Sequence, residues 1–317
     1  MKIEQCKNKI LLGDAAEILR KLPDESIDCI VTSPPYWALR DYSVDRQIGL
    51  EPTFQQYIEK LCEVFDEVKR VLKFFGTCWV NLGDTYGTGS GSGVRIGKQA
   101  TNRGTQYNRR WQEKGKAGVK GMEKCLLQIP ARFAIAMCDR GWILRNEIIW
   151  HKPNAMPQSA KDRFTVDFEK IFFFVKSRNY YFETQYDPYA KPLNCRDAAR
   201  LAAAGRNKRC VWSINTKPQK DAHFATFPPA LMETPIKAGC PEDGIVLDPF
   251  IGSGTTAEVA RLLGRNFIGI ELNPDYVIIA NKRLERALGG NLDGVLAKSI
   301  PLAVDRRLKD KKILKKS

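Results

Sequence analysis

The stretch Ile245-Val246-Leu247-Asp248-Pro249-Phe250-Ile251-Gly252-Ser253-Gly254-Thr255-Thr256 joins a short apolar run to a segment with helical spacing, residues 255–263. The apolar run predicts a buried strand, and the two glycines permit a tight turn that a ligand can approach closely. Open α/β sheets bind ligands at the carboxyl ends of their strands, which is where this turn lies. The stretch therefore predicts a strand–turn–helix unit with a binding function.

The strand expected next, 267–270, ends at Glu271. A carboxylate about twenty residues after a glycine-rich turn is placed to accept hydrogen bonds from ribose hydroxyls. The glycine spacing differs from the GxGxxG pattern of dinucleotide-binding proteins. We therefore expect a cofactor with a ribose, bound between the turn and Glu271.

The remaining chain alternates strand and helix patterns. Apolar runs predict further strands at 9–12, 26–32, 77–82, 143–150 and 170–175. Helical spacing of apolar residues predicts helices at 15–22, 54–72, 130–140, 228–237 and about 275–287. This alternation indicates an α/β fold with a mostly parallel sheet that is buried on both faces.

A second motif, Thr32-Ser33-Pro34-Pro35-Tyr36, follows the predicted strand 26–32. Two consecutive prolines fix φ and remove two N–H donors, so the strand cannot continue its hydrogen-bond ladder. The rigid corner presents the Ser33 hydroxyl, the Pro34 carbonyl and the Tyr36 ring. Such acceptors and an aromatic face suit a planar group that bears an amine.

The charge distribution points to a polyanionic partner. The chain has 51 Lys and Arg against 36 Asp and Glu, a net charge of +15. Cationic side chains that neutralise phosphates release condensed counterions, which favours nucleic acid as the partner. The excess is concentrated in the polar segment 87–121, which we expect to be mobile without DNA, in 184–222 and in the tail 291–317.

Together, TSPPY at 32–36 and DPFIGSGTT at 248–256 resemble the amino-methylating DNA methyltransferases, and their order matches the permuted β group of that family. The resemblance implies a permuted, Rossmann-like fold with a seven-stranded, mostly parallel sheet and helices on both faces. It implies S-adenosyl-L-methionine as cofactor, double-stranded DNA as partner and a flipped target base. It divides the chain into a catalytic half (1–183), a target-recognition region (184–222), a cofactor-binding half (223–290) and the basic tail (291–317).

The resemblance also assigns residues. It implies catalysis by Ser33, Pro34, Pro35 and Tyr36. For the cofactor it implies Asp14, Ser33, Phe227, Pro228, Asp248, Pro249, Phe250, Gly252, Ser253, Gly254, Thr255, Glu271 and Asn273. Arginine and asparagine are the side chains that most readily read guanine and adenine edges. As DNA-binding candidates in the irregular segments we take Arg103, Arg109, Arg110, Arg196, Arg206, Asn207 and Arg209.

The chemistry expected is direct transfer to an exocyclic amine. The N–H groups of the amine would donate to the Ser33 hydroxyl and the Pro34 carbonyl. Because the methyl donor is already activated, positioning of the amine against it would supply much of the rate acceleration. Methylation of cytosine carbon 5 uses a Pro-Cys nucleophile, and the chain has no Pro-Cys dipeptide. The Thr-Ser-Pro-Pro-Tyr sequence resembles the cytosine-N4 signature. We favour cytosine N4, with adenine N6 as the alternative.

Other classes fit less well. Methyltransferases of protein glutamine or RNA have Asn where this chain has Ser33, a nicotinamide oxidoreductase needs another glycine spacing, and a non-catalytic nucleic-acid-binding protein needs neither motif. Nine cysteines without a CxxC pair and two histidines predict no metal site. No apolar run has the length of a membrane span, and we expect a cytoplasmic, nucleoid-associated enzyme. A cognate restriction endonuclease, and a monomer or a homodimer, are compatible with the sequence.

Overall fold

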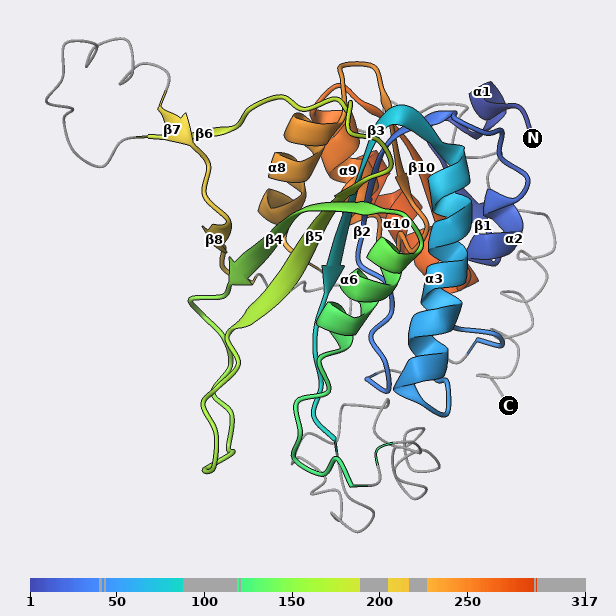
Figure 1. Cartoon of the computed structure of the whole chain (residues 1–317). Helices are drawn as coiled ribbons and strands as arrows, with labels where there is room; N and C mark the ends of the chain where they lie inside the picture. The colour runs from blue at the N-terminus through green and yellow to red at the C-terminus, as the bar shows by residue number, and fades with distance from the viewer. Residues whose placement is uncertain are drawn as a thin grey trace, which may run out of the picture.

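The computed structural model describes residues 1–39, 42, 44–87, 119, 121–188, 205–216, 227–287 and 289. Its centre is a sheet in the order β1-β10-β9-β2-β3-β5-β4-β8 (Figure 1). The strands are β1 (Lys9–Leu12), β2 (Ile27–Thr32), β3 (Leu72–Leu82), β4 (Ile143–His151), β5 (Phe168–Val175), β8 (Val211–Ser213), β9 (Ile245–Asp248) and β10 (Asn266–Glu271).

Most neighbouring strands are parallel, which confirms the predicted sheet class. From β1 through β10, β9 and β2 to β3, every pairing is parallel. Within the central sheet of the described residues, only β5 runs antiparallel to its neighbours, β3 and β4. It follows β4 after the loop 152–167, and antiparallel neighbours need no helical crossover. The seven predicted strands are all present, and β8 adds an eighth beside β4.

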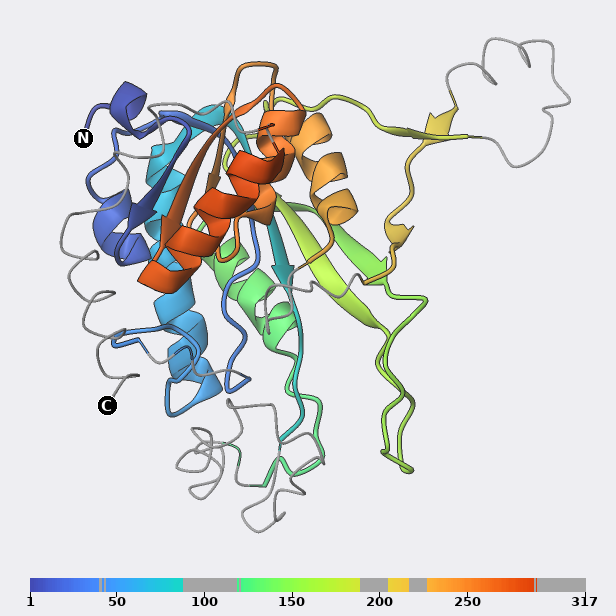
Figure 2. The same cartoon turned by 180° about the vertical axis from the view of Figure 1, so that it is seen from behind.

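Helices cover both faces of the sheet (Figures 1 and 2). On one face lie α1 (Ile3–Cys6), α2 (Ala15–Leu19), α3 (Phe54–Val71) and α6 (Ile129–Asp139). On the other lie α8 (Pro229–Gly239), α9 (Thr255–Leu262) and α10 (Pro274–Ala287). Strand residues alternate between the two cores: Ile30 packs into the first, and Cys29 and Val31 into the second.

The α3–β3 junction shows how local sequence sets an element. Thr53 caps α3, because its hydroxyl accepts from the Gln56 amide at 3.2 Å. The helix ends at Val71 and β3 begins at the next residue, earlier than the predicted strand at Thr77. The pairing of β2 with β3 shifts register in this part, and the alternation of apolar residues that marks a strand is missing there.

The carboxyl ends of the parallel strands meet at one edge of the sheet. Asp248 of β9 lies beside Gly269 of β10, and Leu12 of β1 lies beside Glu271. Strand β2, which leads into Ser33, pairs with β9 although it precedes β9 by more than half the chain. Both predicted motifs therefore lie at this edge, which we call the catalytic edge after the role expected for these motifs.

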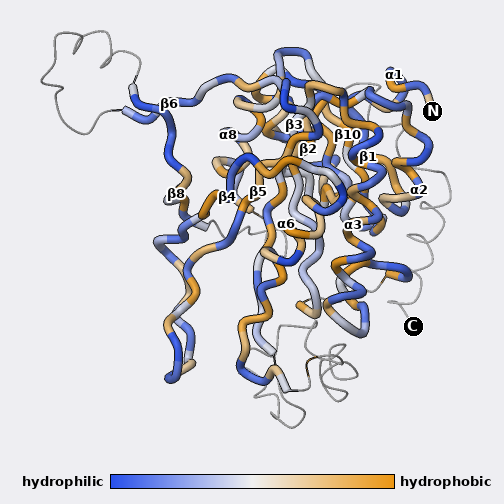
Figure 3. Tube along the Cα trace, in the orientation of Figure 1, coloured by the Kyte–Doolittle hydropathy of each residue, from blue (hydrophilic) through white to orange (hydrophobic). Residues whose placement is uncertain are grey.

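A narrow arm extends from the body of the molecule (Figures 1 and 2). It contains the two-stranded sheet of β6 (Tyr186–Asp187) and β7 (Arg206–Asn207). Figure 3 shows that this arm is mainly hydrophilic, whereas hydrophobic residues follow the strands of the central sheet. Among the described ranges, no helix is long and apolar enough to cross a membrane.

Candidate active site

The glycine-rich turn connects β9 to α9 at the catalytic edge. Gly252 and Gly254 have φ values of +53° and +86°, a region that favours glycine. A Cβ at Gly254 would lie 2.9 Å from the Ala280 Cβ, so this glycine lets α9 approach α10. A Cβ at Gly252 would instead meet only the Phe250 carbonyl oxygen, at 3.9 Å. The turn is therefore closely packed at Gly254 and open at Gly252.

Asp248 fastens this turn to β2. It is fully buried, and its two carboxylate oxygens accept from the Thr32 hydroxyl at 2.6 Å and the Thr256 hydroxyl at 2.7 Å. The Phe250 amide donates to it at 3.0 Å. Burial raises the pKa of the Asp248 carboxyl to about 6, although these hydrogen bonds oppose the change. Asp248 thus joins the strand before the catalytic corner to the start of α9.

Glu271 lies across the turn from Asp248, half-buried at the end of β10. Its carboxylate accepts from the Gly252 amide at 2.9 Å and the Asn273 amide at 2.8 Å. Burial raises the pKa of Glu271 to about 7. The Gly13 amide donates to the Glu271 carbonyl at 2.9 Å, which brings Asp14 to the same end of the sheet.

Several predicted cofactor residues also hold helix ends. Asp14 caps α2 by accepting from the Glu17 amide at 3.0 Å, and Asn273 accepts from the Asp275 amide at 2.9 Å at the start of α10. Ser253 and Thr255 accept from the Arg283 guanidinium at 3.3 and 2.8 Å. Among the others, Pro249 is buried, Phe250 and Phe227 are half-buried, and Pro228 is the N-cap of α8.

The Ser33–Tyr36 corner follows β2 and is braced from α3 and β3. The Pro35 carbonyl accepts from the Tyr57 hydroxyl at 2.9 Å. The Tyr36 ring lies against the backbone of Gly83, where a Cβ would come within 2.5 Å of the ring. Neighbouring segments therefore fix the position of this corner.

The polar side chains behind this corner were not predicted. The Tyr36 hydroxyl donates to Glu169 Oε2 at 2.6 Å, and Asn81 Nδ2 donates to the same oxygen at 3.1 Å. Glu169 Oε1 forms an ion pair with Lys152. Burial and the Glu169 carboxylate hold the pKa of Tyr36 well above its ordinary value. The one sequence signal for this cluster is a polar residue, Asn81, within the apolar end of β3.

The predicted DNA-binding residues lie apart from the corner or outside the described residues. Arg206 and Asn207 form β7 on the arm, and the Arg209 amide donates to Asp187 at 3.4 Å. The structure does not bring these three to the catalytic edge (Figure 1). Outside the described residues lie Arg103, Arg109, Arg110 and Arg196.

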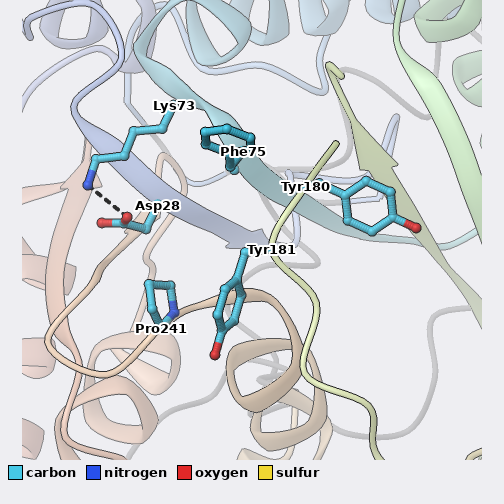
Figure 4. A pocket seen from close by; sticks show the side chains of 7 residues that line it. Asp28, Lys73, Phe75, Tyr180, Tyr181 and Pro241 are labelled. Carbon is cyan, nitrogen blue, oxygen red and sulfur yellow. Dashed lines mark hydrogen bonds and ion pairs between the residues drawn. The ribbon is translucent and has the colours of Figure 1, made fainter. Parts of the chain in front are cut away.

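A cavity of about 380 Å³ lies elsewhere in the fold (Figure 4). Its lining includes Asp28, Lys73, Phe75, Tyr180, Tyr181 and Pro241. Asp28 and Lys73 form an ion pair of 2.7 Å at the amino-terminal ends of β2 and β3, opposite the catalytic edge. None of the predicted site residues lines this cavity.

Comparison with known proteins decides the family. Residues 27–282, from β2 into α10, match the model of the N6/N4 methyltransferase family, described as DNA methylase. The chain belongs to this family. Type II methyltransferase M.XycI of Xanthomonas campestris pv. cyanopsidis is 45% identical over 276 residues, which cover 86% of each chain. M.SmaI of Serratia marcescens is 41% identical over 280 residues, covering 88% of this chain and 91% of its own.

Solved structures of DNA methylases share the fold. PvuII DNA methyltransferase, which is cytosine-N4-specific, superposes with a TM-score of 0.61 at 22% identity, over 89% of this chain and 93% of its own. The structure of a Thermus thermophilus protein solved with S-adenosyl-L-methionine superposes with a TM-score of 0.56 at 24% identity. The match covers 89% of this chain and 96% of the Thermus protein. These likenesses confirm the predicted Rossmann-like methyltransferase fold.

This member of the DNA methylase family is a DNA methyltransferase, and S-adenosyl-L-methionine is its cofactor, as predicted. The residues at the catalytic edge fit that molecule. Glu271 has no cationic partner within the part of the chain that the structure describes, and its remaining lone pairs suit ribose hydroxyls. Beside it, the turn is open at Gly252, which lets a ligand approach the backbone.

Proposed function

We propose that this enzyme methylates the exocyclic N4 amine of cytosine in double-stranded DNA. The observation that carries the proposal is the Ser33–Tyr36 corner, joined through Thr32 and Asp248 to the cofactor turn. The hydrogen-bond acceptors for an amine and the turn that would bind the methyl donor thus lie together at the catalytic edge. The Thr-Ser-Pro-Pro-Tyr sequence supports cytosine over adenine.

For cofactor binding we assign the predicted set around the turn. The Glu271 carboxylate would accept from the ribose hydroxyls, and Asp14 on the neighbouring strand end would contact the adenine. The methionine part of the cofactor would bind the turn 248–255. Phe227, Pro228 and Asn273 would contact the rest of the cofactor's surface. When bound, S-adenosyl-L-methionine supplies an activated methyl group on a sulfonium.

For catalysis we assign Ser33 and Pro34 as the acceptors of the amine N–H bonds. In the free base the amine lone pair is delocalised into the ring, which makes it a poor nucleophile. Two acceptors out of the ring plane favour a pyramidal nitrogen whose lone pair points at the methyl group. Pro35 keeps the corner rigid, and Tyr36 would stack on the flipped base, an interaction worth about 1–3 kcal/mol on aromatic platforms.

We assign DNA binding to two segments, the target-recognition region 184–222 and the basic polar segment 87–121. Arg206, Asn207 and Arg209 stand on a hydrophilic arm, where a long polyanion can reach them without entering the catalytic edge. The remaining candidates, Arg103, Arg109, Arg110 and Arg196, would contact phosphates or bases. Since curated relatives are type II methyltransferases, we also propose a cognate restriction endonuclease as the functional counterpart.

The test is to incubate the enzyme with DNA and isotopically labelled S-adenosyl-L-methionine, digest the DNA and identify the methylated nucleoside by mass spectrometry. We expect N4-methylcytosine from the parent and much less of it, at a slower but measurable rate, from Ser33→Ala. N6-methyladenine would overturn the choice of base while leaving the amine chemistry intact. Label on neither base would overturn the proposed substrate.

A further inference from the structure

Asn81 is the link between the catalytic corner and the buried charge behind it. It is 2% exposed, in a strand end that is otherwise apolar. Its Oδ1 lies 3.3 Å from the Ser33 hydroxyl, and its Nδ2 lies 3.1 Å from Glu169 Oε2 and 3.2 Å from the Lys170 carbonyl oxygen. The amide thus has distinct neighbours on its two sides.

These neighbours fix the orientation of the Asn81 amide. A carboxylate and a backbone carbonyl only accept hydrogen bonds, so the NH₂ group must face them. The opposite orientation would place an amide oxygen against two acceptors and leave a buried polar group unsatisfied. Glu169 therefore directs Oδ1 of Asn81 toward Ser33.

The proton of Tyr36 does not compete for that oxygen. Its hydroxyl lies 2.6 Å from Glu169 Oε2 and 3.1 Å from Asn81 Oδ1. A hydroxyl has one proton, and its bond to an ionised acceptor is shorter and stronger than one to a neutral oxygen. Tyr36 thus donates to Glu169, and Oδ1 of Asn81 remains an acceptor for Ser33.

We propose that Glu169, held by Lys152, is a positioning residue that makes the Ser33 hydroxyl a hydrogen-bond acceptor toward the substrate amine. Ser33 donates its proton to Asn81, so both of its lone pairs stay available. If Ser33 instead donated to the amine, it would engage the lone pair that must attack the methyl group. This inference rests on the role proposed above for Ser33.

The first experiment replaces Glu169→Gln and measures single-turnover methyl transfer with the whole enzyme, saturating DNA and S-adenosyl-L-methionine. The new amide NH₂ competes with the amide of Asn81 and the ammonium of Lys152, so Asn81 loses its fixed orientation. We expect the rate constant to fall on the order of 10²-fold, the size of effect that misplacement of a reacting group has. The Kd of the cofactor and the KM of DNA should not change.

The matched control is Glu147→Gln. Glu147 of β4 forms an ion pair of 2.7 Å with Lys170 of β5 and does not touch Asn81 or Tyr36. It should retain the parent rate constant. A normal rate for Glu169→Gln, or an equal loss in the control, would overturn the positioning role.

Rescue gives a readout that a merely structural role would not produce. Adding Lys152→Met to Glu169→Gln removes the ammonium, so the glutamine oxygen can again accept from Asn81 and Tyr36. We expect this double variant to recover about tenfold in rate, the equivalent of one hydrogen bond. A double variant as slow as Glu169→Gln, or slower, counts against the proposal.

A double-mutant cycle separates this inference from the proposed role of Ser33. If Asn81 acts through the Ser33 hydroxyl, Asn81→Leu should slow the parent but cost nothing further in Ser33→Ala. Additive losses would overturn the inference and leave Ser33 in place as acceptor. A Ser33→Ala variant with the parent rate would overturn the proposed role of Ser33 itself.

Discussion

Two carboxyls at the catalytic edge have pKa values above their ordinary range. Asp248 titrates at about 6 instead of 3.8 and Glu271 at about 7 instead of 4.5, because burial penalises their charged forms. The folded chain therefore binds these protons more tightly than the unfolded chain. Their contribution to stability is fully present below about pH 4 and is lost as the pH rises through 6 to 7.

We accordingly expect the free energy of unfolding of the ligand-free enzyme to fall between about pH 4 and pH 8. Each pKa unit corresponds to about 1.4 kcal/mol, so the fall should be on the order of a few kcal/mol. Urea unfolding at a series of pH values measures it, and Glu271→Gln should make the fall smaller. A stability that rises over this range would contradict the assignment of both groups.

Cofactor affinity should show the opposite dependence. The ionised Glu271 carboxylate accepts from ribose hydroxyls better than the protonated form, so binding should strengthen as the pH rises through about 7. Calorimetry of S-adenosyl-L-methionine binding between pH 6 and about pH 8.5 tests this expectation. In Glu271→Gln the affinity should be weaker, and its change near pH 7 should disappear. A dependence that persists in this variant would assign the titration to another group.

Residue by residue, the sequence predicted two motifs that the structure brings to one edge of the sheet, and their roles in the site stay predictions. The Ser33–Tyr36 corner and the turn 248–256 were found because proline and glycine have local conformational effects that a pattern reveals. Glu169 and Lys152 were missed, since their role comes from strand β5 lying beside β3, a pairing that no local pattern encodes. The capping by Asp14 and Asn273 was missed although both precede predicted helices.

At the level of elements, the approach of α9 to α10 depends on Gly254. Gly254→Ala would add strain at a φ of +86° and press its Cβ against Ala280. Gly264→Ala is the matched control, because Gly264 has a φ of +72° and no atom within 4 Å of an added Cβ. We expect a loss of about 1 kcal/mol for the control and about 2–4 kcal/mol for Gly254→Ala.

Urea unfolding measures both losses, and Ala280→Gly in the Gly254→Ala background should restore the part due to the clash. Equal losses of unfolding free energy at the two glycines would mean that α10 shifts to accommodate the added Cβ without a loss of stability.

Most helices and long strands followed the sequence closely, because their apolar spacing reflects the faces that they bury; the early start of β3 and the four-residue α1 did not. The short strands that were missed have a common physical cause. β6, β7 and β8 contain two or three residues each, too few for any alternation to appear. They form because partners distant in sequence supply hydrogen bonds, and β8 joins the sheet only through β4.

For the molecule as a whole, the arm that we propose for DNA recognition lies apart from the catalytic edge. Substituting Ala for Arg206, Asn207 or Arg209 should alter the methylated sequence without changing cofactor affinity, because the arm lies away from the turn. Methylation of a randomised DNA library at fixed salt measures the preference. Uniform loss over all sequences, with only the salt slope changed, would mean that the arm contacts phosphates and that specificity comes from elsewhere.

Removing most of 87–121 tests the second proposed DNA contact. With 88–118 replaced by a short Gly-Ser linker, we expect weaker DNA binding and an unchanged cofactor Kd, because like charges dominate this segment. Fluorescence anisotropy with labelled duplex and calorimetry with cofactor provide the two readouts. Equal loss of both would place the segment in the structural core.

The permuted strand order has a consequence for synthesis on the ribosome. Strands β1 and β2 leave the ribosome early, but β10 is the only partner of β1 in the described sheet, and one side of β2 stays open until β9 appears. The bond from the Ile245 amide to Asp28 spans 217 residues. Contacts this distant form late, and chains are made at about 5–20 residues per second. A nascent chain would thus carry the Ser33–Tyr36 corner for roughly 10 to 50 seconds before the turn 248–255 and Glu271 are synthesised, and until then it could not hold a methyl donor.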